Sequence, residues 1–340
     1  MLKITMFSAA DKVKGQGVGS AYLELIGLLK ERFGDEFDIK INRYRRSQIS
    51  HYHTINFPFF LSTFLPGRGR KIGYVHFLPE TLEGSIKIPQ PFRAIFYWYV
   101  LAFYKRMDHI VVVNPSFVSK LEASGISRGK ITYIPNFVSK DEFHEFNADK
   151  IKNLRAQYRF DQDKFMVLGT GQIQERKGVN DFITLSKQNP SVQFVWAGGF
   201  SFGRITDGYA ELKKVVDNPP ANLRFPGIVD RAELVNYYNM ADLFLLPSYN
   251  ELFPMSVLEA FSCGTPVLLR DLDLYRSIID GYYEAADDVD DMQNKLIMLK
   301  DNPAGMKFLH DKSLIASQRY SEDHLAEIWH RFYLQQAKED

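Results

Sequence analysis

The chain has 340 residues, of which 45% are hydrophobic and 14% aromatic, so it can form two packed domains rather than a disordered segment. Its single cysteine, Cys263, excludes an intramolecular disulfide and fits a reducing compartment such as the cytoplasm. The opening segment MLKITMFSAADK is polar by Ser8, so we expect no signal peptide. No uncharged apolar run approaches the ~20 residues that a membrane-spanning helix needs.

The net charge of +1 conceals an asymmetry along the chain. Residues 1–145 carry 20 Lys and Arg against 13 Asp and Glu, a net charge of +7, while the remainder carries 22 against 28, a net charge of −6. The first part is therefore the one that we expect to meet an anionic surface or substrate. Ordinary scatter of surface charge is the alternative.

The first predicted strand, residues 3–7, leads into a glycine cluster. Gly15, Gly17 and Gly19 precede a predicted helix over residues 20–32. Free backbone amides at the start of a helix favour a phosphate group. A tight turn from strand to helix needs the same glycines, so the cluster alone leaves both interpretations open.

Histidines mark the ends of the next predicted strands. Residues 37–41 and 49–53 read as short strands, and His51 and His53 would share one face of the second. Further metal ligands do not occur nearby, so we expect no metal site. His76 would stand at the carboxyl end of a strand over residues 71–76, which is the edge where open α/β sheets bind ligands. An isolated histidine there is more often structural.

Two apolar, aromatic segments are flanked by cations. Residues 57–65 precede a basic cluster, and residues 91–107 are uncharged over 94–104 with cations at both ends. Aromatic rings beside cations are what an interfacial membrane contact requires. The predicted membrane-contact residues are Arg68, Arg70, Lys71, Arg93, Lys105 and Arg106. Burial in the core is the alternative for both segments, because the second is apolar all round.

Polarity and charge rise near residues 141–149, where we place the domain boundary. Strands over residues 110–113 and 131–134 complete the first domain. The predicted division is 1–145 for a first domain, 146–315 for a second domain, and 316–340 for a C-terminal helix. That helix would place Leu325, Ile328, Trp329 and Phe332 on one face.

The second domain opens with a strand over residues 165–169 and a basic turn. Arg176 and Lys177 precede Gly178 and a predicted helix. Adjacent cations beside a helix start would stabilise a diphosphate leaving group. A solvated basic turn is the alternative. Strands over 193–197 and 223–225 follow, and then a loop over 227–230.

The stretch ADLFLLPSYNELFPMSVLEAFSCGTP, residues 241–266, contains two carboxylates in a defined setting. Leu243 to Leu246 predicts a strand buried on both faces, and Pro254 suits the first turn of a helix that ends before Gly264. Glu251 then lies on the loop beyond the strand, and Glu259 lies inside the helix. Both can accept hydrogen bonds from the hydroxyls of a sugar and a ribose. An exposed loop glutamate and a helix-face glutamate are the plain alternative.

These two glutamates, between LLPS and CGTPV, resemble the signature of family 4 retaining glycosyltransferases. In the first of these motifs, Leu252 stands where the family most often has glycine after the first glutamate. The Arg-Lys-Gly turn resembles a second motif of the family. The resemblance implies the GT-B fold, with two doubly wound Rossmann-like α/β domains that face a central cleft. It implies that domain 1–145 faces the acceptor and the membrane, that domain 146–315 binds the nucleotide-sugar donor, and that the C-terminal helix 316–340 crosses back to the first domain. It implies catalytic roles for His76, Glu251, Arg176 and Lys177, and donor binding by Gly15, Gly17, Arg176, Lys177, Ile228, Glu251, Phe253, Pro254, Met255 and Glu259.

Within that family, the short length, the basic first domain and the stretches GQGVGSAYLEL and GYVHFLPETLEGS look most like bacterial diglycosyl-diacylglycerol synthases. The resemblance implies transfer of galactose or glucose from a UDP-sugar to monoglucosyl-diacylglycerol, by an enzyme peripheral on the inner face of the membrane. It implies no cofactor, no required metal and no nucleic-acid partner. The alternative enzyme is a soluble hexosyltransferase acting on a cell-wall or capsular polysaccharide precursor. A nucleotide-sugar-binding regulatory module is the alternative from another class, although it would have no need of His76.

Overall fold

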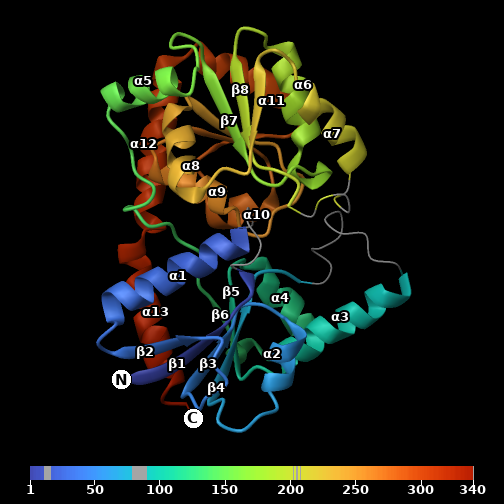
Figure 1. Cartoon of the computed structure of the whole chain (residues 1–340), viewed down its shortest axis with the longest axis vertical. Coiled ribbons are helices and arrows are strands. Elements are labelled where there is room, and N and C mark those ends of the chain that lie inside the picture. The colour runs from blue at the N-terminus through green and yellow to red at the C-terminus, as the bar shows by residue number, and fades with distance from the viewer. Residues whose placement is uncertain (11–16, 79–89, 202, 204–205, 207, 340) are drawn as a thin grey trace. The chain divides into compact units, whose positions relative to one another are not determined.

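The chain folds into two α/β units (Figure 1). A computed structural model describes residues 1–10, 17–78, 90–201, 203, 206 and 208–339. The first unit contains the described residues from Met1 to Phe137 together with those from Glu322 onward, and the second is Val138–Ser321. The chain thus changes unit some residues before the boundary that we placed at 145, and returns after residue 315. Val138 is held in the second unit because its amide donates to Tyr320 O at 3.1 Å.

The first unit is built on a six-stranded parallel sheet with the order β2-β1-β3-β4-β5-β6. Its strands are β1 (Leu2–Phe7), β2 (Phe37–Ile41), β3 (Ile49–Tyr52), β4 (Arg70–Val75), β5 (His109–Val112) and β6 (Ile131–Tyr133). The strand order reverses direction between β1 and β3. In open α/β sheets the crevice at such a switch point, beyond the carboxyl ends of the strands, is the usual ligand site.

Helices cover both faces of this sheet. The helices of the unit are α1 (Gly17–Phe33), α2 (Phe57–Ser62), α3 (Gln90–Lys105), α4 (Ser116–Ala123) and α13 (Glu322–Gln336), with a 3₁₀ turn, η3, at Arg128–Lys130. Phe7 and Tyr52 stack with their ring centroids 4.8 Å apart, and Phe59 of α2 and Phe103 of α3 pack against these two rings. Strand residues whose side chains point to the opposite face of the sheet, such as His51, contact α13.

The last helix, α13, packs on the first unit, as the sequence predicts. Trp329 is fully buried, and His330 stacks on Phe33 of α1 with the ring centroids 4.5 Å apart. The hydroxyl of Tyr333 lies 2.7 Å from Nδ1 of His51, and Gln336 accepts a hydrogen bond from Arg70 Nε at 3.1 Å. The final helix therefore completes the core of a unit that begins more than 300 residues earlier in the chain.

The second unit contains another six-stranded parallel sheet, with the order β12-β11-β10-β7-β8-β9. Its strands are β7 (Met166–Thr170), β8 (Gln193–Ala197), β9 (Leu223–Gly227), β10 (Leu243–Leu246), β11 (Val267–Arg270) and β12 (Glu284–Ala286). Every residue of β10 is buried, as expected for a continuous apolar run between two helical layers. The switch point lies between β7 and β10.

The helices of the second unit alternate with these strands. They are α5 (Ala148–Gln157), α6 (Val179–Gln188), α7 (Tyr209–Asp217), α8 (Arg231–Met240), α9 (Met255–Ser262), α10 (Asp273–Ile278), α11 (Val289–Lys300) and α12 (Pro303–Arg319), with a 3₁₀ turn, η4, at Glu175–Lys177. Both units are therefore doubly wound α/β folds, which confirms the predicted fold class.

Replacing Trp329 with alanine tests how much α13 contributes to the first unit. The variant loses a fully buried indole, so we expect the free energy of unfolding to fall by about 3–5 kcal/mol. Urea denaturation followed by circular dichroism measures it. Leu334→Ala on the same helix is the control, because Leu334 is 37% exposed and should cost much less. A loss for Trp329→Ala as small as the one expected for the control would contradict a place for α13 in the core.

Candidate active site

The loops that leave β7 and β10 are joined by a buried ion pair. Lys177 Nζ lies 2.6 Å from Glu251 Oε1, and Arg176 Nη1 lies 3.8 Å from Glu251 Oε2. Glu251 is only 7% exposed. The sequence placed Arg176 and Lys177 on one loop and Glu251 on another. The structure brings all three together at the switch point of the second sheet.

The electrostatics of this group are balanced between burial and charge. Burial raises the pKa of Glu251, but the charges of Lys177 and Arg176 outweigh it, and the pKa of this carboxyl lies below its ordinary value. Burial also lowers the pKa of Lys177, an effect that the carboxylate of Glu251 opposes. The carboxylate thus stays ionised in a site with little water, where fixed charges act strongly.

Gly178 lets the two loops approach closely. Its φ of +68° is left-handed, and a Cβ there would lie 2.1 Å from the carbonyl oxygen of Pro247. No other residue fits without displacing that backbone. The amide of Tyr249 donates to Arg176 O at 2.9 Å, which ties the loops directly. The Arg-Lys-Gly motif therefore has a steric reason as well as an electrostatic one.

A second ion pair, which the sequence did not suggest, braces the same loops. Asp181 on α6 accepts a hydrogen bond from the Tyr249 hydroxyl at 2.7 Å and pairs with Arg270 at the end of β11. Arg270 Nε donates to Pro247 O at 3.1 Å, and its guanidinium lies 4.3 Å from the centroid of the Tyr249 ring. This arrangement fixes the segment that leads from β10 to Glu251.

Glu259, on α9, is held by two donors. Its Oε1 accepts from Arg231 Nη1 at 2.8 Å and its Oε2 from the Tyr238 hydroxyl at 2.8 Å, and the residue is 4% exposed. Neither donor was singled out from the sequence, because both belong to α8, a separate helix. The carboxylate is therefore rigidly placed before any ligand binds.

The remaining predicted donor-binding residues are divided between the two units. Phe253, Pro254 and Met255 lead into and begin α9, and Phe253 and Met255 are buried. Ile228, which follows β9, is 43% exposed, and its Cγ1 lies 2.8 Å from where a Cβ on Gly199 would stand. Gly17 is the first residue of α1 in the first unit, and Gly15 lies outside the described residues.

In the first unit, His76 belongs to a buried group of histidines. It directly follows β4, is 5% exposed, and its ring centroid lies 4.3 Å from that of Tyr74 and 6.3 Å from that of His53. His51 and His53 have ring centroids 4.2 Å apart. Within the described part of the chain, Nε2 of His76 and both ring nitrogens of His53 have no hydrogen-bond partner.

Burial keeps these three imidazoles neutral. Desolvation lowers the pKa of His76 to about 3. The pKa of His51 is also lowered to about 3, mainly by desolvation and to a smaller extent by electrostatic repulsion from His76. The pKa of His53 lies well below its ordinary value for the same reasons. At neutral pH His76 can therefore offer a hydrogen bond, but not a positive charge, at the carboxyl edge of the sheet.

The structure changes the interpretation of the basic cluster after α2. Arg68 is 4% exposed and donates to the carbonyl oxygen of Arg45. Arg70 pairs with Glu339, and Lys71 Nζ lies 2.7 Å from Asp108 Oδ2. These three cations are engaged inside the first unit, which argues against the predicted contact with lipid.

The cations around α3 remain closer to the surface. Lys105 is exposed, and the guanidinium of Arg93 lies over the ring of Tyr97. Arg106 is half-buried, donates to Thr63 O at 2.9 Å and lies 4.2 Å from the centroid of the Phe64 ring. The two segments that the sequence flagged as apolar are thus in direct contact.

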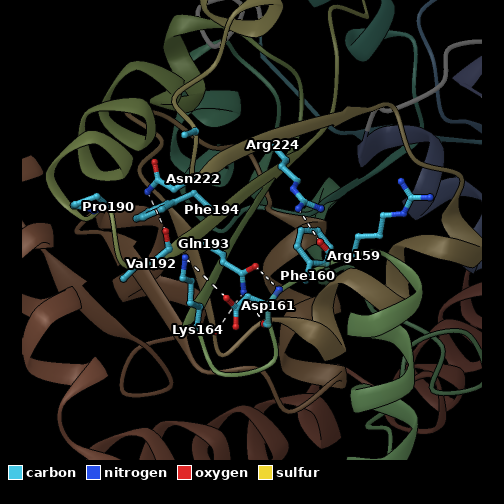
Figure 2. A pocket seen from close by; sticks show the side chains of 11 residues that line it. Arg159, Phe160, Asp161, Lys164, Pro190, Val192, Gln193, Phe194, Asn222 and Arg224 are labelled. Carbon is cyan, nitrogen blue, oxygen red and sulfur yellow. Dashed lines mark hydrogen bonds and ion pairs between the residues drawn. The ribbon is translucent and has the colours of Figure 1, made fainter.

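A hollow of about 560 Å³ lies at the edge of the second sheet where the strands begin, opposite the edge that carries Glu251 (Figure 2). Its lining includes Lys164, Gln193 and Asn222, which stand at the amino ends of β7, β8 and β9. Its polar groups pair with one another: Gln193 Oε1 accepts from the amide of Asp161 at 2.7 Å, and Arg224 donates to Arg159 O at 2.7 Å. Ligand sites of such sheets lie at the carboxyl edge, so we assign no function to this hollow.

The family of the chain follows from its sequence relatives. The family described as "Glycosyl transferases group 1" matches residues 150–313, and "Glycosyltransferase Family 4" matches residues 27–142. The alpha-galactosylglucosyldiacylglycerol synthase of Streptococcus pneumoniae is 50% identical over 337 residues, 99% of this chain and 90% of that protein. The chain is a family 4 glycosyltransferase. The processive diacylglycerol alpha-glucosyltransferase of Acholeplasma laidlawii is 31% identical over 58% of this chain and 61% of its own.

Solved structures confirm the GT-B fold of this glycosyltransferase. HepE of Anabaena, in complex with UDP and glucose, aligns with a TM-score of 0.80 at 15% identity over 98% of this chain and 100% of its own. Sucrose-phosphate synthase of Thermosynechococcus elongatus aligns with a TM-score of 0.82 at 15% identity over 100% of both chains. Among the described residues, no helix has the length and apolar character to cross a membrane, and no cluster of His, Cys, Asp and Glu could hold a metal ion.

The neutral histidines should make the first unit acid-sensitive. Their pKa values are lower in the folded state than the ordinary 6.5, so the unfolded chain binds more protons below pH 6.5. The stabilising contribution is complete above pH 6.5 and is lost as the pH falls toward about 3. Three protons correspond to a slope of up to about 4 kcal/mol per pH unit. Native-state hydrogen exchange of the β3 and β4 amides, corrected for intrinsic rates, measures it.

His53→Phe removes one of the three titrating groups and should reduce that slope by about 1.4 kcal/mol per pH unit. His324→Asn on α13 is the control, because His324 is exposed and should leave the slope unchanged. An identical slope in the His53 variant would contradict the assignment of a buried, neutral ring.

Asp181→Asn tests the brace between α6 and β11. The variant leaves Arg270 buried without its carboxylate partner, so we expect the second unit to lose about 3 kcal/mol of stability. Urea unfolding monitored through Trp196, which is buried in β8, measures this loss. Asp217→Asn makes the same change in an exposed pair with Lys213 and should have almost no effect. Equal effects of the two substitutions would show that the brace contributes nothing beyond a surface ion pair.

Proposed function

We propose that this glycosyltransferase transfers galactose or glucose from a UDP-sugar to monoglucosyl-diacylglycerol, with retention of configuration, to form diglycosyl-diacylglycerol. The observation that carries the proposal is the 50% identity, over 99% of the chain, to an alpha-galactosylglucosyldiacylglycerol synthase. The glucosyltransferase from Acholeplasma, whose name specifies diacylglycerol, supports a lipid acceptor.

The donor is assigned to the loops at the switch point of the second sheet. Arg176 and Lys177 supply two adjacent cations for the diphosphate. Glu259, already fixed by Arg231 and Tyr238, is assigned to the ribose hydroxyls, and Glu251 to the sugar. In this assignment each carboxylate accepts hydrogen bonds from hydroxyl groups, which needs no metal ion.

The reaction exchanges one glycosidic bond for another. The bond between the anomeric carbon and the diphosphate oxygen breaks, and the acceptor hydroxyl oxygen bonds to the same face of that carbon. The leaving phosphate takes the hydroxyl proton. Arg176 and Lys177 stabilise the charge that develops on the diphosphate. Neutral His76, whose Nε2 has no partner among the described residues, is assigned a hydrogen bond to the donor sugar.

The acceptor is a lipid, so the enzyme must work at a membrane surface. We propose that it is a peripheral protein on the cytoplasmic face, where UDP-sugars are available. The excess of positive charge in the first 145 residues supports attraction to anionic lipid.

A transfer assay tests the function directly. UDP-glucose and UDP-galactose are each offered to vesicles that contain diacylglycerol or monoglucosyl-diacylglycerol, and the lipid products are separated and identified. We expect a diglycosyl product only from the glucolipid and with one of the two donors. Confirmed UDP binding without any lipid product would favour the soluble transferase that acts on a polysaccharide precursor.

Lys177→Met is the catalytic control for this assay. It keeps the length of the side chain but removes a cation at the diphosphate, so we expect kcat to fall about 10²- to 10³-fold. Lys187→Met, an exposed residue of α6, is the matched control and should retain full activity. Unchanged turnover of the Lys177 variant would refute the assigned role of that residue.

A further inference from the structure

The first unit exposes an unusual number of large apolar side chains on one side. Phe57, Phe64, Leu65, Phe92, Ile95 and Trp98 are each 51–68% exposed. All of them belong to α2, to the turn that follows it, or to α3. We call this set the aromatic face. Contiguous apolar surface of this kind marks a site of interaction.

Contacts between α2 and α3 show that these side chains form one surface. The ring of Tyr99 on α3 lies 6.4 Å from that of Phe57 and 5.4 Å from that of Phe60, measured between centroids. The Tyr99 hydroxyl donates to Ile55 O. Phe59 of α2 and Phe103 of α3 pack on the sheet through Phe7 and Tyr52, so the exposed side chains of the aromatic face lie on the other sides of the two helices.

Three arginines border the aromatic face, and the sequence analysis did not single them out. Arg43, Arg45 and Arg46 lie on the exposed segment between β2 and β3. None of their guanidinium groups pairs with an acidic side chain in the described structure. The ring of Tyr44 packs on Phe7 with the centroids 5.5 Å apart. Phe7 is the residue that Phe59 of α2 covers on the same side of the sheet.

The Arg43–Arg46 segment also adjoins the turn after α2. Arg46 Cγ lies 2.7 Å from where a Cβ on Gly67 would stand, and Ser47 N donates to Gly67 O at 3.0 Å. Between Asp38 and Glu80 the sequence contains seven Lys and Arg and no acidic residue. Helix α3 contains no acidic residue either. The free cations therefore lie beside the turn after α2, and no acidic residue occurs on α2, on α3 or on the segment between β2 and β3.

We propose that this surface docks on an anionic lipid bilayer. The aromatic and aliphatic side chains enter the boundary between headgroups and acyl chains, and Arg43, Arg45 and Arg46 meet the lipid phosphates. The inference rests on the proposed function in one respect, since a lipid acceptor requires a membrane-bound enzyme. The lipid-contact residues differ from those expected from the sequence. Arg68, Arg70 and Lys71 bond within the first unit, whereas Arg43, Arg45 and Arg46 pair with no acidic side chain in the described structure.

Charge decides between a bilayer and a second copy of the chain as the occupant. In a symmetric dimer the same patch meets itself, so the arginines of both copies would approach one another without acidic partners. An anionic bilayer offers the opposite charge over the whole surface, together with an apolar layer for Trp98 and its neighbours.

Sedimentation with vesicles tests the proposal without donor or acceptor. The vesicles contain phosphatidylglycerol and phosphatidylcholine, and phosphatidylcholine alone serves as the neutral reference. We expect the protein to bind the anionic vesicles and to be released as salt increases. Arg43→Ser, Arg45→Ser and Arg46→Ser together should weaken binding about 100-fold, or about fivefold for each charge. Ile95→Ser with Trp98→Ser should weaken it about tenfold or more at every salt concentration.

A matched control removes the same charge from the second unit. Lys152, Lys187 and Lys214 are exposed there, and their replacement by serine should leave vesicle binding unchanged. Equal weakening by the two triple variants would overturn the proposal, because it would show an effect of net charge alone. Light scattering that reveals a dimer, abolished by the Ile95 and Trp98 substitutions, would also overturn it.

Transfer to a short-chain, water-soluble glucolipid separates this inference from the proposed function. The triple arginine variant should transfer to that acceptor at the wild-type rate and lose activity only with vesicles. Loss of activity with both acceptors would overturn a role confined to docking. Vesicle binding by a wild-type protein that transfers to neither acceptor would refute the proposed function but would support the docking surface.

Discussion

The ion pair between Lys177 and Glu251 holds together the part of the molecule on which the chemistry depends. The crossovers from β7 and β10 run to opposite sides of the switch point, and the amide of Tyr249 joins their loops by donating to Arg176 O at 2.9 Å. The ion pair between side chains, the close approach at Gly178 and the brace through Asp181 add to that backbone bond. In the proposed function, the two cations are therefore already in position when the diphosphate binds, as electrostatic catalysis requires.

The two units treat buried ionisable groups in opposite ways. In the second unit, charges are kept and paired, as with Glu251 and Glu259. In the first unit, His51, His53 and His76 are kept neutral by desolvation. This difference suits a transferase, because the negative charge develops on the diphosphate, whereas the sugar and the acceptor are neutral and need hydrogen bonds. Burial therefore disfavours a positive charge on His76.

The sequence predicts those features whose signal is local. The strand Leu243–Leu246 is a continuous apolar run, and the Arg-Lys-Gly turn and the two glutamates are short motifs. The brace from Asp181 to Arg270 was missed because its members lie 89 residues apart and each is of a type usually found on the surface. Arg70 was assigned to lipid for the same reason, since its partner, Glu339, is 269 residues away. Periodicity also cannot decide which side of α3 is exposed, because the helix is apolar all round.

The cations of the first unit fall into two groups, those paired with carboxylates and those beside the aromatic face. Within the residues that the structure describes, Arg70 and Lys71 pair with carboxylates, whereas Arg43, Arg45 and Arg46 do not. A fold that needed only solubility would gain nothing from placing unpaired cations beside exposed aromatic rings. Residues 1–145 carry a net charge of +7 and the remainder −6. In the proposed docking, an anionic surface attracts the first part of the chain and repels the second, which favours contact through the part that carries the aromatic face.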